Sequence, residues 1–338
     1  MKAHTPIGAA LVMLAIGSMH APLRAQAVGV QAYGQIRLTA NRVESGPARV
    51  HELRDNASRL GFRGSEDLGG GVSALFGLEM GLEADTGAAT DPIYRNSYVA
   101  LRNGAGTLAL GRLDSANPTG SPLYSQVTAI VGFAPNDAGA TAIGTSVLNA
   151  RNRVSNAIGY RSPDWGGLEF MARGYLRGAG TAAEAEHAAR SVDLGLMYRR
   201  GPLTAGVGFG KDERSGGLLA NEFDAKWQVG ARYSFGFVEP YVMVGTDRFN
   251  SSGTRRRSVD YWLVGTELTL GLHAVVLNVM EKDVQTSLTG TRKRQQMAYL
   301  YRFSKRTQFQ AFFDNDGVDS SRSNVRIRAV GTGVRHDF

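Results

Sequence analysis

The sequence predicts an all-β protein: a single antiparallel transmembrane barrel of sixteen strands, with a long third loop folded into its lumen. Three observations predict this class. The 338-residue chain has 43 glycines, 10 prolines and no cysteine, a composition that suits strands and turns better than helices. Apolar and polar residues alternate with a period of two along most of the chain. The alternating segments number sixteen, and an even count fits a closed antiparallel barrel.

The first element is an apolar run, Ile7 to Met19, which follows Lys2 and precedes the triplet Ala25-Gln26-Ala27. This order is typical of a secretory signal peptide, so we expect residues 1–27 to be removed and residues 28–338 to form the mature barrel. The alternative is an N-terminal membrane anchor, but the run is short for a span. The removed segment holds two basic residues and no acid, so the net charge falls from +8 to +6.

The predicted strands then follow in order, each with one apolar and one polar face. In the segment 71–84, Val72, Phe76 and Leu78 share a face and Glu79 lies opposite. The connections alternate between tight turns and longer polar loops, which is the pattern of outer-membrane barrels and not of a soluble sandwich. The segments lie near residues 30–41, 57–64, 71–84, 94–103, 105–113, 153–162, 167–178, 190–199, 202–211, 223–235, 238–249, 258–268, 271–281, 294–303, 307–315 and 325–338.

One connection differs from the others: residues 114–152, between the fifth and sixth segments, lack strand alternation. Loops of this length inside a compact domain are usually functional. The apolar content, with Ile130, Val131 and Phe133, disfavours the alternative of a disordered surface loop. We therefore expect this loop to pack against the inner wall of the barrel.

Segments along the whole mature chain resemble the trimeric general porins of Gram-negative outer membranes, above all the betaproteobacterial and neisserial branch. The fourteen residues Ser58–Gly71, SRLGFRGSEDLGGG, are similar to the second strand and first turn of that family. The other similar segments are Val30–Gly34, Asn96–Leu101, Gly106–Arg112, Arg153–Pro163, Ser304–Thr307 and Gly333–Phe338.

The resemblance implies a homotrimer in the outer membrane, inserted by the outer-membrane assembly machinery, with the third long loop narrowing each pore. Phe338 completes the lipid-facing alternation of the last segment, and the resemblance implies that this residue serves as the C-terminal assembly signal. Family members that prefer cations carry several acids in the third loop. Residues 114–152 contain only Asp114 and Asp137, so the chain departs from that pattern.

Arginines on the inner face of the predicted barrel are the candidate pore residues. In the first segment Ile36 and Leu38 face lipid, so Arg37 faces the lumen, and equivalent parity applies to the others; Arg112 is ambiguous because its segment ends there. The candidate lumen charges are Arg37, Arg59, Arg63, Arg112 and Arg153, with Asp114 and Asp137 on the loop. The alternative is that these arginines simply pair with loop acids. Since the loop offers so few acids, we predict a pore that prefers anions.

Enzymatic and nucleotide-binding functions have weaker signals. None of the four histidines of the mature chain has a zinc-ligand spacing or an obvious carboxylate partner. The segment Gly206–Lys211 is glycine-rich but alternates as a strand, and no helix follows to bind a phosphate. The basic runs Arg255–Arg257 and Arg292–Arg294 are predicted to lie in solvated loops, with lipopolysaccharide phosphates as the functional alternative.

The predicted function is a water-filled channel that passes small hydrophilic solutes and ions across the outer membrane, without turnover, cofactor, metal or nucleic acid. The expected partners are further copies of the chain, outer-membrane lipid and lipopolysaccharide, and the insertion machinery. The alternatives are a substrate-specific channel and a barrel used as an adhesin or receptor. Most predicted outer loops are about ten to fifteen residues, which is short for an adhesin.

Overall fold

The computed structural model describes most of the chain after residue 28. The described residues are 29–114, 122–131, 148, 153–175, 189–214, 217–251, 253, 255–285, 288–320 and 323–338. The expected signal peptide, residues 1–27, lies outside them, as do Asp137 and most of the loop 114–152.

The described residues form seventeen strands and one short helix. In chain order these elements are β1 (Gly29–Ser45), β2 (Ala48–Asp55), β3 (Arg59–Gly69), β4 (Val72–Glu83), β5 (Ala88–Asn103), β6 (Gly106–Leu113), α1 (Pro122–Ile130), β7 (Val154–Arg161), β8 (Leu168–Tyr175), β9 (Ala189–Arg200), β10 (Leu203–Arg214), β11 (Glu222–Tyr233), β12 (Val238–Asn250), β13 (Ser258–Leu270), β14 (His273–Asp283), β15 (Gly290–Arg302), β16 (Thr307–Ser320) and β17 (Ser323–Asp337).

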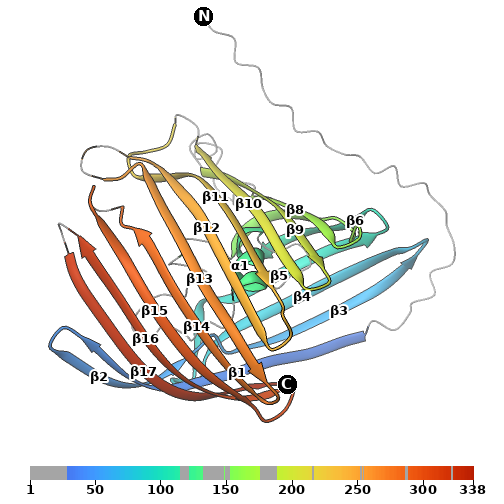
Figure 1. Ribbon diagram of the computed structural model, residues 1–338. Helices are drawn as coiled ribbons and strands as arrows, with labels where there is room; N and C mark the ends of the chain where they lie inside the picture. The colour runs from blue at the N-terminus through green and yellow to red at the C-terminus, as the bar shows by residue number, and fades with distance from the viewer. Residues whose placement is uncertain are drawn as a thin grey trace, which may run out of the picture.

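The strands form one closed antiparallel sheet around a central lumen (Figure 1). Strands β4 to β16 each pair with the strand before and the strand after, β3 pairs with β1 and β4, and β17 pairs with β16 and β1 to complete the ring. Closure leaves no exposed sheet edge at this junction, so the backbone groups of β1 and β17 are hydrogen-bonded to each other in the apolar layer. The predicted barrel class is confirmed.

The second strand position is divided between β2 and β3. Strand β3 pairs with Gly29–Gln35 of β1, and β2 pairs with Leu38–Ser45 of the same strand. Between them Ala57 has a φ of 66°, and Asn56 turns inward to donate to Thr39 Oγ1 at 2.8 Å. The barrel therefore has sixteen strand positions, as predicted, although the prediction began the second strand at residue 57 and missed β2.

The two faces of each strand differ sharply in chemistry. On β13, Trp262 and Val264 are 39% and 50% exposed, while their neighbours Tyr261 and Leu263 point inward and are buried. Exposed apolar side chains on the outside are what a lipid-facing barrel requires. We refer to the side of Trp262 and Val264 as the outer face. Within the described residues no helix has the length and apolar character to cross a membrane.

The two ends of the barrel carry different connections. Tight turns such as Asn103–Gly106 and Arg200–Leu203 join strands at one end, where the C-terminal Phe338 also lies. The opposite end carries the longer connections, and there β6 ends at Leu113 and β7 begins at Val154. Several of these loops are shorter than predicted, because strand pairing continues beyond the apolar band: β10 extends to Arg214 and β11 begins at Glu222.

The basic run Arg292–Arg294 was predicted to lie in a loop, and this prediction was wrong. It lies within β15, so its side chains alternate between the two faces. Arg294 points inward, is 1% exposed and pairs with Asp314, and Arg292 pairs with Asp316, whereas Lys293 is exposed on the outer face. The run Arg255–Arg257 does lie in the connection between β12 and β13.

Candidate functional site

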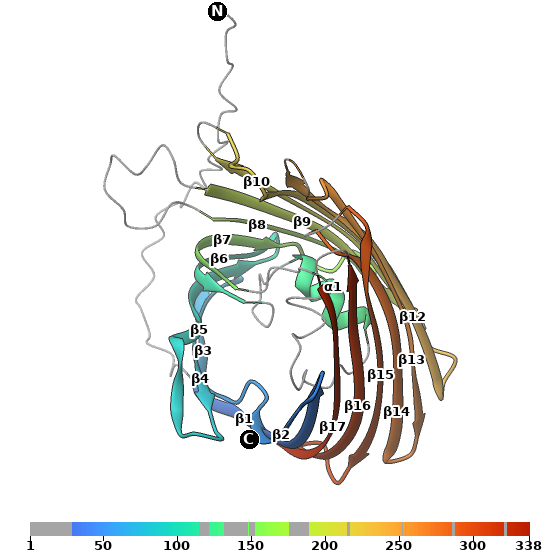
Figure 2. The same cartoon turned by 90° about the vertical axis from the view of Figure 1, so that its left-hand side faces the viewer.

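Helix α1 lies inside the barrel, against the inner wall of β9 and β10 (Figure 2). The wall is made of glycines at this place. A Cβ on Gly208 would lie 2.7 Å from both Leu123 and Gln126 of the helix, and a Cβ on Gly195 would lie 2.8 Å from Pro122. Glycine therefore permits an approach between helix and sheet that any side chain would prevent. We call Gly195, Gly206 and Gly208 the glycine floor.

Two glutamines fix the helix on this floor. Gln228 Nε2 donates to Gln126 Oε1 at 2.9 Å and to the carbonyl oxygen of Leu123 at 2.7 Å. Gln126 Nε2 in turn donates to the carbonyl oxygen of Val207 on β10. Both glutamine side chains are fully buried, where an unmade hydrogen bond is costly, so the paired amides specify one position for the helix.

A buried ion pair of the wall binds the backbone of Leu148, which follows α1 in the sequence. Lys226 Nζ donates to Asp247 at 2.7 Å and also to the carbonyl oxygen of Leu148, a residue of the 114–152 loop. Lys282 donates to the second oxygen of Asp247 at 2.8 Å. Lys226 and Asp247 have almost no exposed surface, so the loop backbone at Leu148 completes a buried network on the wall.

A second buried pair lies where the loop begins. Arg173 pairs with Asp193 at 2.8 Å, both 1% exposed, and Arg173 also donates to the carbonyl oxygen of Leu113 at 3.5 Å. Leu113 is the last residue of β6, directly before the loop. Buried charged groups of the wall therefore bind the backbone both before α1, at Leu113, and after it, at Leu148.

Opposite the helix, Glu79 of β4 collects three neighbouring side chains. Arg95 Nε lies 2.8 Å from Glu79 Oε1, Arg59 Nε lies 3.5 Å from Glu79 Oε2, and the Tyr33 hydroxyl donates to Oε2 at 3.2 Å. The sequence prediction included Arg59 but missed Arg95 and Glu79. Glu79 stood on the polar face of its segment and could have been found, whereas a register shift in the pairing of β4 with β5 hides the parity of Arg95.

Arg153 lies close to this group. Its Nε is 3.4 Å from Asp114 Oδ2, so the predicted alternative of pairing with a loop acid holds for this arginine. The same charges act on Tyr124 of α1. Burial raises the pKa of its hydroxyl, and the positive charges of Arg153, Arg95 and Arg59 offset part of that rise. The positive charges of three arginines from separate parts of the wall therefore act on the Tyr124 hydroxyl of α1.

The other predicted lumen arginines contact neutral groups. Arg37 Nε donates to Gln310 Oε1 at 3.2 Å. Arg63 Nε donates to Gln31 Oε1 at 3.0 Å, and its guanidinium carbon lies 4.9 Å from the centre of the Tyr33 ring. Both residues face inward, as parity predicted.

Arg112 has a different placement from the one expected. In the pairing of β5 with β6 it lies opposite Ser97, on the same face as Leu110 and Val99, which are exposed on the outer face. Its guanidinium donates to Ser155 Oγ at 2.7 Å. The structure therefore separates Arg112 from the inward-facing arginines.

The C-terminal Phe338 seats against the first strand. Its backbone exchanges two hydrogen bonds with Gly34, at 3.0 and 3.1 Å. A Cβ on Gly34 would lie 2.3 Å from the Phe338 ring, so the glycine provides the space that the aromatic ring occupies. Phe338 as a whole residue is 48% exposed.

Comparisons with known proteins agree with this architecture. A family model described as Gram-negative porin matches residues 9–321. Outer membrane porin protein 32 of Delftia acidovorans is 28% identical over 288 residues, 82% of this chain and 80% of its own. Among solved structures, an anion-selective porin from Comamonas acidovorans has a TM-score of 0.73 at 22% identity, covering 92% of this chain and 100% of its own. The trimer form of OmpT from Vibrio cholerae has a TM-score of 0.67 at 12% identity, with 93% and 100% covered.

Proposed function

Since this chain belongs to the Gram-negative porin family and is an outer-membrane porin, which is a channel, we propose that its pore prefers small anions. One observation carries the proposal. Beside α1, the three positive charges of Arg59, Arg95 and Arg153 meet the two negative charges of Glu79 and Asp114. The balance of this group is positive, whichever way the individual pairs form.

A small imbalance is sufficient in such a place. Low-dielectric walls focus the field of the charge that is in excess, and rings of charged side chains set ion preference in channels. Two unit charges about 4 Å apart interact by about 4 kcal/mol at an effective dielectric of about 20, well above thermal energy. The anion-selective porin from Comamonas acidovorans, which has the same fold, is named for this preference.

We further propose that residues 114–152 are the constriction loop. The glycine floor and the Gln126–Gln228 pair hold α1 inside the lumen, and the charges of the arginine group act on Tyr124 of that helix. A helix held against one wall narrows the opening toward the other wall. This arrangement brings a passing anion close to the guanidinium groups, where selectivity is set.

The remaining proposals concern targeting and assembly. Residues 1–27 are proposed to be a cleaved signal peptide, and Phe338 to be the C-terminal signal for the insertion machinery. We propose a homotrimer, supported by the trimer form of the similar Vibrio cholerae OmpT. The end that carries loops 114–153 and 284–289 is proposed to face outward and to contact lipopolysaccharide, because outer-membrane barrels place short turns in the periplasm.

Reversal potential across a KCl gradient tests the anion preference. The native channel is expected to favour chloride, and Arg95→Glu is expected to shift the potential toward potassium because it replaces one positive charge of the group by a negative one. Arg248→Gln is the matched control, since this exposed arginine lies on the outer face of β12. Potassium preference in the native channel, or an unchanged potential in Arg95→Glu, would contradict the proposal.

A further inference from the structure

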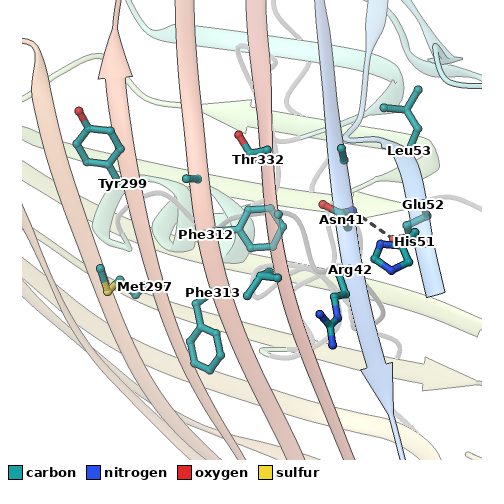
Figure 3. A pocket seen from close by; sticks show the side chains of 14 residues that line it. Asn41, Arg42, His51, Glu52, Leu53, Met297, Tyr299, Phe312, Phe313 and Thr332 are labelled. Carbon is teal, nitrogen blue, oxygen red and sulfur yellow. Dashed lines mark hydrogen bonds between the residues drawn. The ribbon is translucent and has the colours of Figure 1, made fainter. Parts of the chain in front are cut away.

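The lipid-facing wall carries a groove that the channel function does not use. It runs over the outer face of β15, β16, β17 and β1 to the edge of β2, with a volume of about 890 Å³ (Figure 3). Small side chains make its floor, among them Ala40, Ala311 and Thr332. Met297, Tyr299 and Phe313 line its sides, so the groove is mainly apolar. An acyl chain has the chemistry that fits it.

Basic residues follow the groove toward the loop end of the barrel on two of these strands, β15 and β17. Along β15 the outer face continues from Met297 to Lys293, about 13 Å toward the loop end at 3.3 Å per residue. Along β17 it continues from Val330 to Arg328 and Arg326. The order from the barrel centre to the loops is therefore apolar, then cationic.

A glycine opens a hollow within this basic region. In the strand register Lys293 lies opposite Gly317, which lies opposite Arg326, so the two cations flank a position without a side chain. The hollow has a volume of about 600 Å³ and also presents Gln295 and Asn315, which can donate hydrogen bonds. Cations and amides around a recess form a suitable receptor for phosphate oxygens.

The acids nearby do not cancel this charge. Glu44 is held by Arg42 at 2.7 Å and by Arg49 at 3.5 Å, and Glu281 lies 3.6 Å from Lys293. Within the part of the chain that the structure describes, Arg326 and Arg328 form no ion pair. The region, with Asp319 included, has five cations and three carboxylates. The cations are Lys293, Arg326, Arg328, Arg42 and Arg49, and the carboxylates are Glu44, Glu281 and Asp319.

We propose that this face is a binding site for a phosphorylated glycolipid of the outer leaflet, with an acyl chain in the groove and a phosphate between Lys293 and Arg326. The apolar and cationic regions occur in the order in which such a lipid presents its parts from the bilayer interior to its surface. The inference rests on the proposed orientation of the barrel, with its loops facing outward. It is independent of ion selectivity, because all the residues involved lie on the outer face.

The test compares two double variants of the folded trimer or monomer in detergent. Arg326→Gln/Arg328→Gln is expected to weaken binding of bisphosphorylated lipid A about 30-fold, at about fivefold for each basic side chain near a membrane surface. Arg190→Gln/Arg248→Gln removes the same charge from exposed positions on β9 and β12, and is expected to leave the affinity unchanged. Bound lipid is counted by native mass spectrometry, with lipid A lacking both phosphates as the second probe.

A third variant tests the groove alone. Thr332→Phe fills its floor and is expected to weaken binding of both lipids, whereas the Arg326→Gln/Arg328→Gln variant weakens only the phosphorylated one. Equal affinity of native protein for both lipids, or equal losses in the two double variants, would overturn the proposal. So would a Thr332→Cys cross-link to a second copy in native membranes, since the groove would then be a protein interface.

Conductance separates this inference from the channel itself. Each variant should retain the native single-channel conductance and reversal potential, which also shows that it folds. A variant that binds no lipid yet conducts normally supports the site. If the native channel shows no anion preference, the proposed selectivity is wrong, but the lipid-binding result still stands.

Discussion

Glu79 shows how a single carboxylate organises the pore wall. It is 2% exposed, yet it contacts Arg59, Arg95 and Tyr33. Parity along the strands predicted the inward direction of Arg37, Arg59 and Arg63, because apolar neighbours mark the lipid face. The partners of these arginines come from other strands, and a single sequence contains no signal for which residues become neighbours across a barrel.

Replacing Glu79 tests the charge balance directly. Glu79→Gln keeps the size and one acceptor oxygen but removes a negative charge, so the preference for chloride is expected to rise. Reversal potential in a KCl gradient measures it, with Glu281→Gln on the outer face as the control. No difference between these two variants would show that the Glu79 charge does not reach the permeating ion.

Helix α1 was missed in the sequence, although its signals are present. Ser121 and Pro122 form a typical helix start, since proline is favoured at the first helical position. Leu123, Val127 and Ile130 follow at helical spacing and are among the residues that the structure buries. The strand β2 was missed for the opposite reason: on one face His51 lies beside Arg49, and on the other Val50 lies beside Glu52, so it has no continuous apolar face.

The glycine floor makes a sharp prediction for α1. In Gly208→Val the new side chain meets Leu123 and Gln126, so the helix should shift and single-channel conductance should change. Overpacking of this kind lowers the free energy of unfolding by about 1–3 kcal/mol. Gly174→Val on β8 is the control, because the nearest atom to its Cβ is 3.7 Å away. Equal conductance changes in both variants would show that the glycine floor does not determine the position of α1.

Disruption of the buried Lys226–Asp247 ion pair is expected to lower the free energy of unfolding. Lys226→Met leaves Asp247 with Lys282 alone and leaves the Leu148 carbonyl without its donor. Removing one partner of a buried pair costs about 3–5 kcal/mol, measurable by urea unfolding in detergent. Lys293→Met on the exposed outer face should change stability by less than about 0.5 kcal/mol. A small effect of Lys226→Met would mean that water reaches this pair.

At the scale of the whole molecule, sixteen strand positions, their order and the alternation of turns and loops followed from period-two patterning, because each strand separates lipid from water by itself. Loop lengths did not, since pairing continues past the apolar band where the pattern fades. The closed ring also concentrates the field of the inward arginines in one aqueous path.

That field should depend on salt in a defined way. The Debye length falls from about 10 Å at 0.1 M to about 3 Å at 1 M, so anion preference is expected to decline as the mean KCl concentration rises. Reversal potentials at a constant concentration ratio, measured at several mean concentrations, check this. A preference independent of salt would point to a contact too close for mobile ions to screen.

The junction of Gly34 with Phe338 implies that the starting point of this chain is arbitrary once the ring exists. The first and last strands are neighbours, held by the same ladder of hydrogen bonds as any other pair. Joining the two ends by a short linker and opening the chain in the hairpin between β1 and β2 would reorder its synthesis while leaving every strand pair in place. Until the final strand is made, however, β1 lacks its β17 neighbour, and an unpaired strand edge attracts other chains. The pairing of β1 with β17 is therefore the step that removes this open edge from the sheet.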